Sequence, residues 1–192
     1  MITNLNEALY RHQTLICQDV ILRKYREADI MALHLTMNDP ETLQYLDWAK
    51  DTYTLEDARS SIFDYFWAQP GRWAIVEKGD DNNVTIGSID IRINKAKELA
   101  EFGYVLNKAY WGKGYMTQAL QAVIALAFDV LDVNKVESQH YDGNEKSGRV
   151  MQKCGMVLEG IKKQHKPHKG RYVDEVMYGI TKEAYLNRTN KE

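Results

Sequence analysis

The segment 85–94, TIGSIDIRIN, limits the possible folds more than any other part of the chain, because its apolar and polar residues alternate. A period of two places one set of side chains on each face of a β-strand. Strand-like runs flank the segment at 72–78 and 98–107, and the polar stretch Glu77–Asn83 is predicted to be a hairpin loop. The sequence therefore predicts three consecutive antiparallel strands. The residues predicted to line the buried face of the middle strand are Ile89, Ile91 and Ile93.

Helical periodicity marks the segments on both sides of these strands. The clearest stripe runs from Met116 to Leu131, with apolar residues recurring every three or four positions. Two earlier helices are predicted at 26–39 and at 54–71, and Thr54 with Asp57 forms a variant of the capping box at the start of the second. This mixture predicts an α+β fold with a mainly antiparallel sheet. The remaining predicted elements are strands at 135–141, 157–164 and 172–180 and a helix at 144–154.

Length and charge predict a single globular domain with no general affinity for polyanions. The chain has 192 residues, so we expect one domain over 1–192, with a core from about residue 13 to about residue 184. A formal net charge of −2 argues against nucleic acid or an anionic membrane as a partner. No run approaches the roughly 18–20 apolar residues that a membrane span needs, and the N-terminus lacks a secretory signal pattern. The distant cysteines Cys17 and Cys154 are typical of a reduced, cytoplasmic protein.

A glycine-lysine-glycine turn opens the clearest helix, in the sequence YWGKGYMT at 110–117. Gly112 and Gly114 allow a tight turn and let a ligand approach the backbone closely. The first N–H groups of a helix have no internal partners, and the helix dipole is positive at that end. Such an end binds anions, phosphate above all, and Lys113 adds a positive charge. The segment is therefore predicted to cradle a phosphate.

The residues alone leave several interpretations of this turn open. A nucleotide P-loop requires G-x-x-x-x-G-K-[ST], but Asn107 stands at its first glycine and Gly114 at its Ser/Thr position. A dinucleotide motif G-x-G-x-x-G fits Gly112 and Gly114, fails at Thr117, and retains an acid about twenty residues further on, Asp132. A glycine-rich turn without any ligand is the third interpretation, and the pyrophosphate of coenzyme A is the fourth.

Two blocks of residues support coenzyme A, because they resemble the GNAT acyltransferases. The first block is Glu101–Tyr104 (EFGY) followed by Tyr110–Tyr115 (YWGKGY), and it is most similar to the RimJ/RimL branch of ribosomal-protein N-terminal acetyltransferases. The second is Asn144–Met156, which is similar to the N-x-x-S-x-R-V-x-x-K-x-G-F of that branch. The resemblance covers nearly the whole chain. It implies a GNAT-type fold, with a mixed, mainly antiparallel central sheet and helices on both faces.

Three residues depart from the pattern of the wider superfamily. Trp111 stands where Arg or Gln is preferred, although Trp is usual in this branch. Met116 stands where Gly or Ala is preferred, which would narrow the loop. Met151 occupies the place where many GNAT enzymes carry a tyrosine general acid.

The resemblance implies acetyl-CoA as cosubstrate and no metal. The pantetheine arm is expected between two splayed strands, bonded to the backbone of Tyr104, Val105 and Leu106. Asn144 is expected to cap a helix, and the family adds a contact with the coenzyme. The residues expected to surround the pyrophosphate are Trp111, Gly112, Lys113, Gly114, Tyr115, Met116 and Thr117.

Two residues are candidates for the acetyl-transfer chemistry, each with a structural alternative. Glu101 is the candidate base for the acceptor amine, acting directly or through a water; the alternative is a solvent-facing glutamate in a charged stretch. Ser147 is the candidate donor to the thioester sulfur; the alternative is a first-turn serine bonded to its own backbone.

The acceptor is predicted to be a primary amine, and a protein N-terminus fits the resemblance best. By resemblance, its binding loop contains Asp47, Trp48 and Asp51, whose acids suit a cationic amine. His165 and His168 are expected in a basic hairpin loop, without a metal. The predicted function is direct acetyl transfer in a ternary complex. The alternatives are a CoA-binding module without catalysis and an acetyltransferase of small amines such as polyamines, and either a monomer or a homodimer fits.

Overall fold

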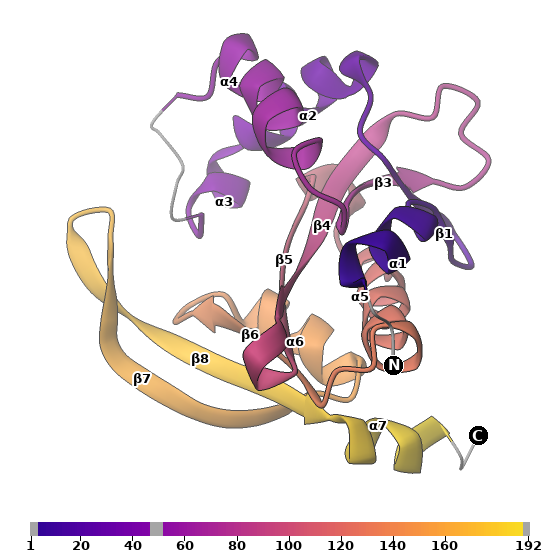
Figure 1. Cartoon of the computed structure of the whole chain (residues 1–192). Helices are drawn as coiled ribbons and strands as arrows, with labels where there is room; N and C mark the ends of the chain where they lie inside the picture. Colours follow the sequence, from indigo (N-terminus) through magenta and orange to yellow (C-terminus); the bar gives the residue numbers. More distant parts are fainter. Residues whose placement is uncertain (1–3, 47–51, 190–192) are drawn as a thin grey trace.

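The structure is a computed structural model that describes residues 4–46 and 52–189. The strands within these residues form one eight-stranded sheet (Figure 1). The strand order is β1-β2-β3-β4-β5-β6-β8-β7. All neighbouring strands pair antiparallel except β5 and β6, which are parallel. The strands are β1 (Leu15–Ile16), β2 (Val20–Arg23), β3 (Arg72–Glu77), β4 (Thr85–Asn94), β5 (Leu99–Leu106), β6 (Lys135–Tyr141), β7 (Val157–His168) and β8 (Arg171–Thr181).

Seven α-helices accompany the sheet within the described part of the chain. The helix that follows Thr54 continues beyond Ser60 as a π-helical segment, Ser61–Phe66, and a second such segment, Leu126–Val130, extends the central helix. The α-helices are α1 (Leu5–Arg11), α2 (Ile30–Met37), α3 (Pro40–Leu43), α4 (Leu55–Ser60), α5 (Tyr115–Ala125), α6 (Glu145–Lys153) and α7 (Lys182–Thr189).

Local capping decides where several of these helices begin. The predicted capping box is confirmed at α4, where Thr54 accepts from the backbone N–H of Asp57 and the Asp57 carboxylate accepts from the backbone N–H of Thr54. The predicted helix over 26–39 is instead divided. It begins with a 3₁₀ turn, Glu27–Asp29, and α2 ends at Met37. Asp39 then caps α3, with Pro40 at its first position.

Helices cover both faces of the sheet, as expected. Figure 1 shows α2, α3 and α4 on one side of β3–β5, and α1 with α5 on the other. The larger core lies on the α5 side and contains Ile89, Phe102 and the predicted stripe of α5, together with Ala8 and Leu9 of α1. The smaller core lies under α2 and α4 and includes Tyr25, Ile62 and Ala74. Strand alternation therefore gives β5 two different faces, one toward each core.

The parallel pair β5–β6 separates soon after it forms. Its register joins Leu99 to Lys135, Ala100 to Val136 and Glu101 to Glu137, and the pairing ends there. On its other edge, β5 stays paired with β4 as far as Leu106. The strands therefore diverge from Phe102 onward, which leaves a V-shaped opening in the sheet.

The β7–β8 hairpin extends past the opening and corrects one prediction. His165 and His168 belong to β7 rather than to a loop, and the turn lies at Lys169–Gly170. The register of β7 against β8 shifts between Lys162 and Lys166, so the strand bulges and then resumes pairing. Figure 1 shows the hairpin curving away from the rest of the sheet, with its tip toward α3.

Candidate active site

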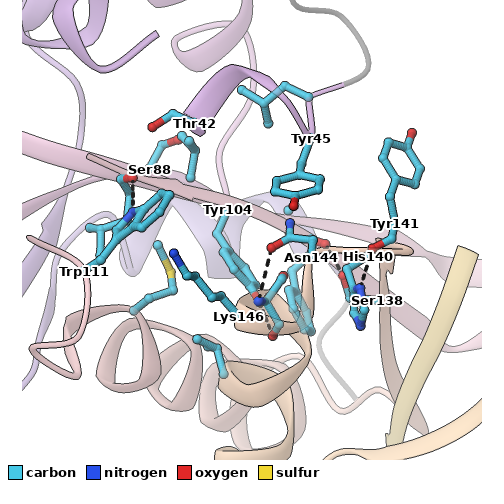
Figure 2. A pocket seen from close by; sticks show the side chains of 18 of the residues that line it. Thr42, Tyr45, Ser88, Tyr104, Trp111, Ser138, His140, Tyr141, Asn144 and Lys146 are labelled. Atoms are coloured by element: carbon cyan, nitrogen blue, oxygen red, sulfur yellow. Dashed lines mark hydrogen bonds between the residues drawn. The ribbon is translucent and has the colours of Figure 1, made fainter. Parts of the chain in front are cut away.

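A cleft of about 1260 Å³ occupies the opening between β5 and β6. Its walls come from β4, β5, β6 and the first turns of α5 and α6, and residues of α2, α3 and the α4 layer line its other side. Figure 2 shows Tyr104, Ser138, His140 and Asn144 around this pocket, with Tyr45 above them. The two blocks that carry the family resemblance thus meet at one place in the fold.

The glycine turn lies at the end of the cleft where α5 begins. Gly114 is the N-cap of α5 with φ +82°, and Gly112 has φ +80°, so both adopt the left-handed backbone that favours glycine. No side chain of the described residues caps this helix, and its first backbone hydrogen bond runs from the Gln118 N–H to the Gly114 carbonyl oxygen. The N–H groups of the first turn are therefore available to an anion. A Cβ on either glycine would meet no atom of residues 4–46 and 52–189 within 4 Å, so the described part of the chain leaves the space above the loop open.

Trp111 and Lys146 fix the loop to the rest of the site. The Trp111 indole N–H donates to the carbonyl oxygen of Leu106, 2.7 Å away, at the end of β5. The Lys146 ammonium of α6 lies 4.4 Å from the centre of the same indole ring (Figure 2). Trp111, which stands where the wider superfamily prefers Arg or Gln, thus contacts both β5 and α6 and holds the loop between them.

The remaining loop residues point in different directions. Met116 is 5% exposed and packs in the core, so it lines the cleft without obstructing the loop. Thr117 lines the same cleft. Lys113 instead lines a neighbouring, more open cavity of about 920 Å³, where its ammonium lies 4.0 Å from the Glu77 carboxylate. The Tyr115 hydroxyl also donates to Glu77, which raises the pKa of that phenol.

The three residues predicted to bond the pantetheine arm lie at the diverging end of β5. Tyr104, Val105 and Leu106 all line the cleft. They remain paired with β4 and lie beyond the last residue of β5 that pairs with β6. Tyr104 packs against the larger core and Val105 against the smaller one.

Ser147 joins α6 to the floor of the cleft. Its hydroxyl oxygen lies 2.7 Å from the Tyr104 phenol oxygen, and the same phenol donates to the Ser147 carbonyl oxygen at 2.9 Å. The Ser147 hydroxyl is thus bonded to Tyr104 of β5 rather than to the backbone of its own helix. Burial raises the pKa of Tyr104, so its phenol stays protonated at neutral pH. Asn144 caps α6 as predicted, with its side-chain oxygen 3.4 Å from the Ser147 N–H.

Met151 does not take part in the cleft. Its side chain is fully buried in the larger core, one helical turn beyond Ser147. A leaving thiolate in the cleft would therefore meet the hydroxyls of Ser147 and Tyr104, not the residue at the tyrosine position of many relatives.

Asp90 and Glu101 are two of the carboxylates near the point where β5 and β6 separate, together with Glu137, and the sequence indicated only Glu101 as a site residue. Glu101 is exposed and stands outside the residues that line the cleft. Asp90 of β4 lines the cleft, with its side chain only 14% exposed and paired with Arg92. Asp90 alternates with isoleucines in β4, a pattern that predicts a solvent-facing side chain and does not indicate that Asp90 lies within a cleft. Asp90 is therefore a site residue that pattern analysis missed.

The far end of the cleft is bridged by α3 and the residues after it. The Tyr45 hydroxyl donates to the Gly143 carbonyl oxygen at 2.7 Å, and His168 Nε2 lies 2.7 Å from the Gln44 carbonyl oxygen. Lys166 of β7 lines the cleft, and its ammonium lies 3.0 Å from the buried Glu175 carboxylate. The first contact ties the residues after α3 to the loop before α6, and the second ties them to the β7–β8 hairpin. The predicted acceptor residues Asp47, Trp48 and Asp51 lie outside the described residues.

Residues 4–46 and 52–189 contain neither a metal-binding cluster nor a membrane-spanning helix. Within that part of the chain, no group of three or more His, Cys, Asp or Glu side chains has the geometry to hold a metal ion. No helix there has the length and apolar character needed to cross a membrane.

Comparison with known proteins agrees with this geometry. Residues 19–157 match the acetyltransferase (GNAT) domain. The chain is 27% identical over 176 residues to the uncharacterized N-acetyltransferase p20 of Bacillus licheniformis, covering 90% of this chain and 98% of that protein. The crystal structure of a GNAT-family acetyltransferase from Bacillus anthracis superposes with a TM-score of 0.80 at 26% identity, covering 88% of this chain and 99% of that one.

Other relatives differ in the acceptor that their names give. The putative ribosomal N-acetyltransferase YdaF of Bacillus subtilis (strain 168) is 26% identical over 163 residues, 83% of this chain and 88% of that protein. The spermidine N(1)-acetyltransferase of Escherichia coli (strain K12) is 25% identical over 168 residues, 87% of this chain and 88% of that protein. The first supports the resemblance to the RimJ/RimL branch. Together with the domain match, these likenesses show that the chain belongs to the GNAT family of acetyl-CoA-dependent N-acetyltransferases.

Proposed function

We propose that the protein transfers the acetyl group of acetyl-CoA directly to the α-amine of a protein N-terminus, in a ternary complex. One observation carries the proposal: a single cleft is lined by the glycine turn of α5 at one end and by residues of α2, α3 and β4 at the other. Both substrates therefore fit at once, with the thioester between β5 and β6. No covalent acetyl-enzyme is needed for such a transfer.

The residues on the coenzyme side suit the donor. The open space above Gly112 and Gly114 and the free N–H groups of α5 match a pyrophosphate. The cleft edge of β5 matches an extended amide-containing arm, because strand backbone bonds such groups in the manner of an added strand. We assign the pyrophosphate to residues 111–117 and the arm to residues 104–106. Asn144 contributes a further contact at the start of α6.

The leaving thiolate needs a proton or a hydrogen-bond donor. The Ser147 hydroxyl fills this role in the proposal, because it lies on the floor of the cleft and faces β5. A donor aimed at charge that develops during the reaction lowers the barrier more than it strengthens binding.

Protonation favours an α-amine as the acceptor. An α-amine has a pKa of about 8, whereas a lysine amine has a pKa of about 10.4. Near pH 7.4, the α-amine is partly free, while freeing the lysine amine costs about 4 kcal/mol, at about 1.36 kcal/mol per pKa unit. A single carboxylate at the edge of a cleft is a sufficient base for the first acceptor and a weak one for the second. Glu101, through a water, is the base that the family resemblance suggests.

One observation favours a second function. A methionine, Met151, lies buried at the position where many relatives carry a tyrosine general acid. The absence of that tyrosine would suit a CoA-binding module without catalysis. The relationship to a spermidine acetyltransferase keeps small polyamines as a further acceptor class.

A thiol-release assay with acetyl-CoA separates these functions. The acceptors are a panel of N-terminal peptides, spermidine and a buffer blank. The proposal predicts release with at least one free N-terminal peptide, and intersecting rather than parallel double-reciprocal lines. Tight binding of CoA in calorimetry without release by any amine would instead identify a binding module, and release by spermidine alone would identify a polyamine enzyme.

A further inference from the structure

We propose that Asp90, rather than Glu101, is the carboxylate that meets the acceptor amine, binding it as an ammonium ion and then accepting its proton. This inference rests on the proposed transfer to an amine and names the residue that receives the nucleophile. It requires that Asp90 lie at the reacting end of the cleft, on the face opposite to Ser147, and that its carboxylate be accessible from the cleft.

The sheet register places Asp90 at the point where the strands separate. Asp90 is the β4 partner of Gly103, and Arg92 is the partner of Glu101. Glu101 forms the last pair between β5 and β6, so Gly103 lies two residues past it, in the diverging part. A Cβ on Gly103 would lie 3.2 Å from the Asp90 carboxylate, so the glycine leaves room for that carboxylate across β5.

Strand alternation places Asp90 and Ser147 on opposite sides of a thioester held between the strands. Tyr104, which bonds Ser147, packs on the larger core with Phe102. Asp90 and Gly103 point the other way, toward the side of α2 and α4, as does Val105. An amine arriving from the α2 and α4 side therefore meets Asp90, while the thiolate leaves toward Ser147.

The charges around Asp90 leave it able to act as a base. Among the described residues, the charged groups on this face include Arg72 of β3, Arg92 of β4, Glu101 of β5 and the pair Lys135 and Glu137 of β6, and Lys166 of β7 lines the same cleft. The Arg72 guanidinium stacks on the Tyr65 ring, 3.7 Å from its centre, so Arg92 is the ion-pair partner of Asp90. Burial raises the pKa of Asp90 more than Arg92 and Arg72 lower it. A carboxylate of raised pKa holds a proton better near neutral pH.

The step balances without a further reactant. Asp90 first takes one proton from the bound ammonium ion and releases it to solvent, which leaves the free amine. The amine nitrogen then forms a bond to the acetyl carbon, and the carbon–sulfur bond breaks with its electron pair going to sulfur. The second proton lost by the nitrogen goes to the Asp90 carboxylate and from there to solvent. The thiolate takes a proton from the Ser147 hydroxyl, which regains one from solvent, so the products are an amide and a thiol.

Asp90→Asn and Glu101→Gln, compared on the same N-terminal peptide, test the inference. Asp90→Asn should lower kcat/KM by about 10²-fold or more, as loss of a general base does, and should weaken binding of the peptide to the enzyme–CoA complex. Asp64→Asn, on the exposed face of the segment that follows α4, is the matched control and should leave both values unchanged. Affinity for CoA alone should be that of the parent in all three variants.

Two further readouts separate a chemical role from a structural one. Parent activity should fall as pH drops through the raised pKa of Asp90, and Asp90→Asn should lack this acidic limb. Because the folded state disfavours the charged form, Asp90→Asn should not lower the Tm at pH 7. An unchanged kcat/KM and acidic limb in Asp90→Asn would overturn the inference, and a larger loss in Glu101→Gln would give the role to Glu101 while the proposed function stands. An inactive parent would contradict the proposed function and this role together.

Discussion

The phenol oxygen of Tyr104 lies 2.7 Å from the hydroxyl oxygen of Ser147, and this contact joins β5 to the first turn of α6 across the floor of the cleft. The Tyr104 phenol and the Ser147 backbone are also bonded, at 2.9 Å. With Met151 buried one turn further along α6, these two hydroxyls are a pair of protic groups that α6 and β5 bring together in the cleft.

Ser147→Ala should lower kcat more than it raises the KM for acetyl-CoA. A hydrogen bond to a developing thiolate is worth about 1.5–3 kcal/mol, which corresponds to a fall in kcat of about tenfold to a hundredfold. Initial rates measured over a range of both substrates give the two parameters separately. If only KM changes, the serine is a contact for the coenzyme and not a donor to sulfur.

Tyr104→Phe should reproduce part of this loss, because the phenol positions the Ser147 hydroxyl. The raised pKa of Tyr104 keeps the phenol protonated through the neutral range, so the effect should not vary between about pH 6 and pH 9. Tyr10→Phe is the control, since Tyr10 is 54% exposed and lies outside the cleft. In the Ser147→Ala background, Tyr104→Phe should have little further effect on kcat; a full additional loss would show that the tyrosine acts independently.

Gly114→Val should lower the affinity for CoA by about tenfold or more, equivalent to about 1.4 kcal/mol. A valine at φ +82° is strained, and its methyl groups would enter the open space above the loop. Gly170→Val is a matched control, because Gly170 has φ +80°, is equally open and lies in the β7–β8 turn. Calorimetry should show the loss of CoA affinity for Gly114→Val alone. Equal affinities in both folded variants would contradict the assignment of this loop as the pyrophosphate site.

Asp29→Ala should destabilise the fold by about 3–5 kcal/mol, because it leaves the buried Arg23 without its carboxylate partner. The two side chains form a bidentate pair at 2.7 and 2.8 Å and are 4% and 7% exposed. Glu27→Ala breaks the exposed pair with Arg59 and should cost about 0–1 kcal/mol. Urea unfolding of the two variants measures the difference, and similar midpoints would show that solvent reaches Arg23.

Much of the fold follows from the sequence because its signals are local. The alternation over 85–94 and the apolar stripe from Met116 to Leu131 correspond to β4 and to α5 with its π-helical extension. The strands β1 and β2 were not predicted, because two- and four-residue strands carry too little alternation to be recognised. The full extent of β7 was also missed, because its bulge interrupts the pattern of side chains before Lys166.

The candidate site likewise contains residues that local motifs predict and residues that only the tertiary fold brings together. The glycine turn and the Asn144 cap depend on backbone conformation, which short motifs specify directly, and the structure has both where the sequence predicted them. The placement of Asp90 in the cleft depends on which strands diverge and which helices cover them, and the residue spacing within β4 carries no information about either. The pairing of Ser147 with Tyr104 likewise joins residues 43 positions apart.

The most direct test of transfer from acetyl-CoA to an α-amine uses one peptide in two forms, with either its N-terminus or its single lysine side chain blocked. Thiol release with acetyl-CoA is measured near pH 7.4 and the product is identified by mass. We predict turnover of the form with a free N-terminus at a kcat/KM at least about tenfold above that of the form with a free lysine, since their amine pKa values differ by more than two units. Equal turnover, or preference for the lysine amine, would contradict the proposed acceptor.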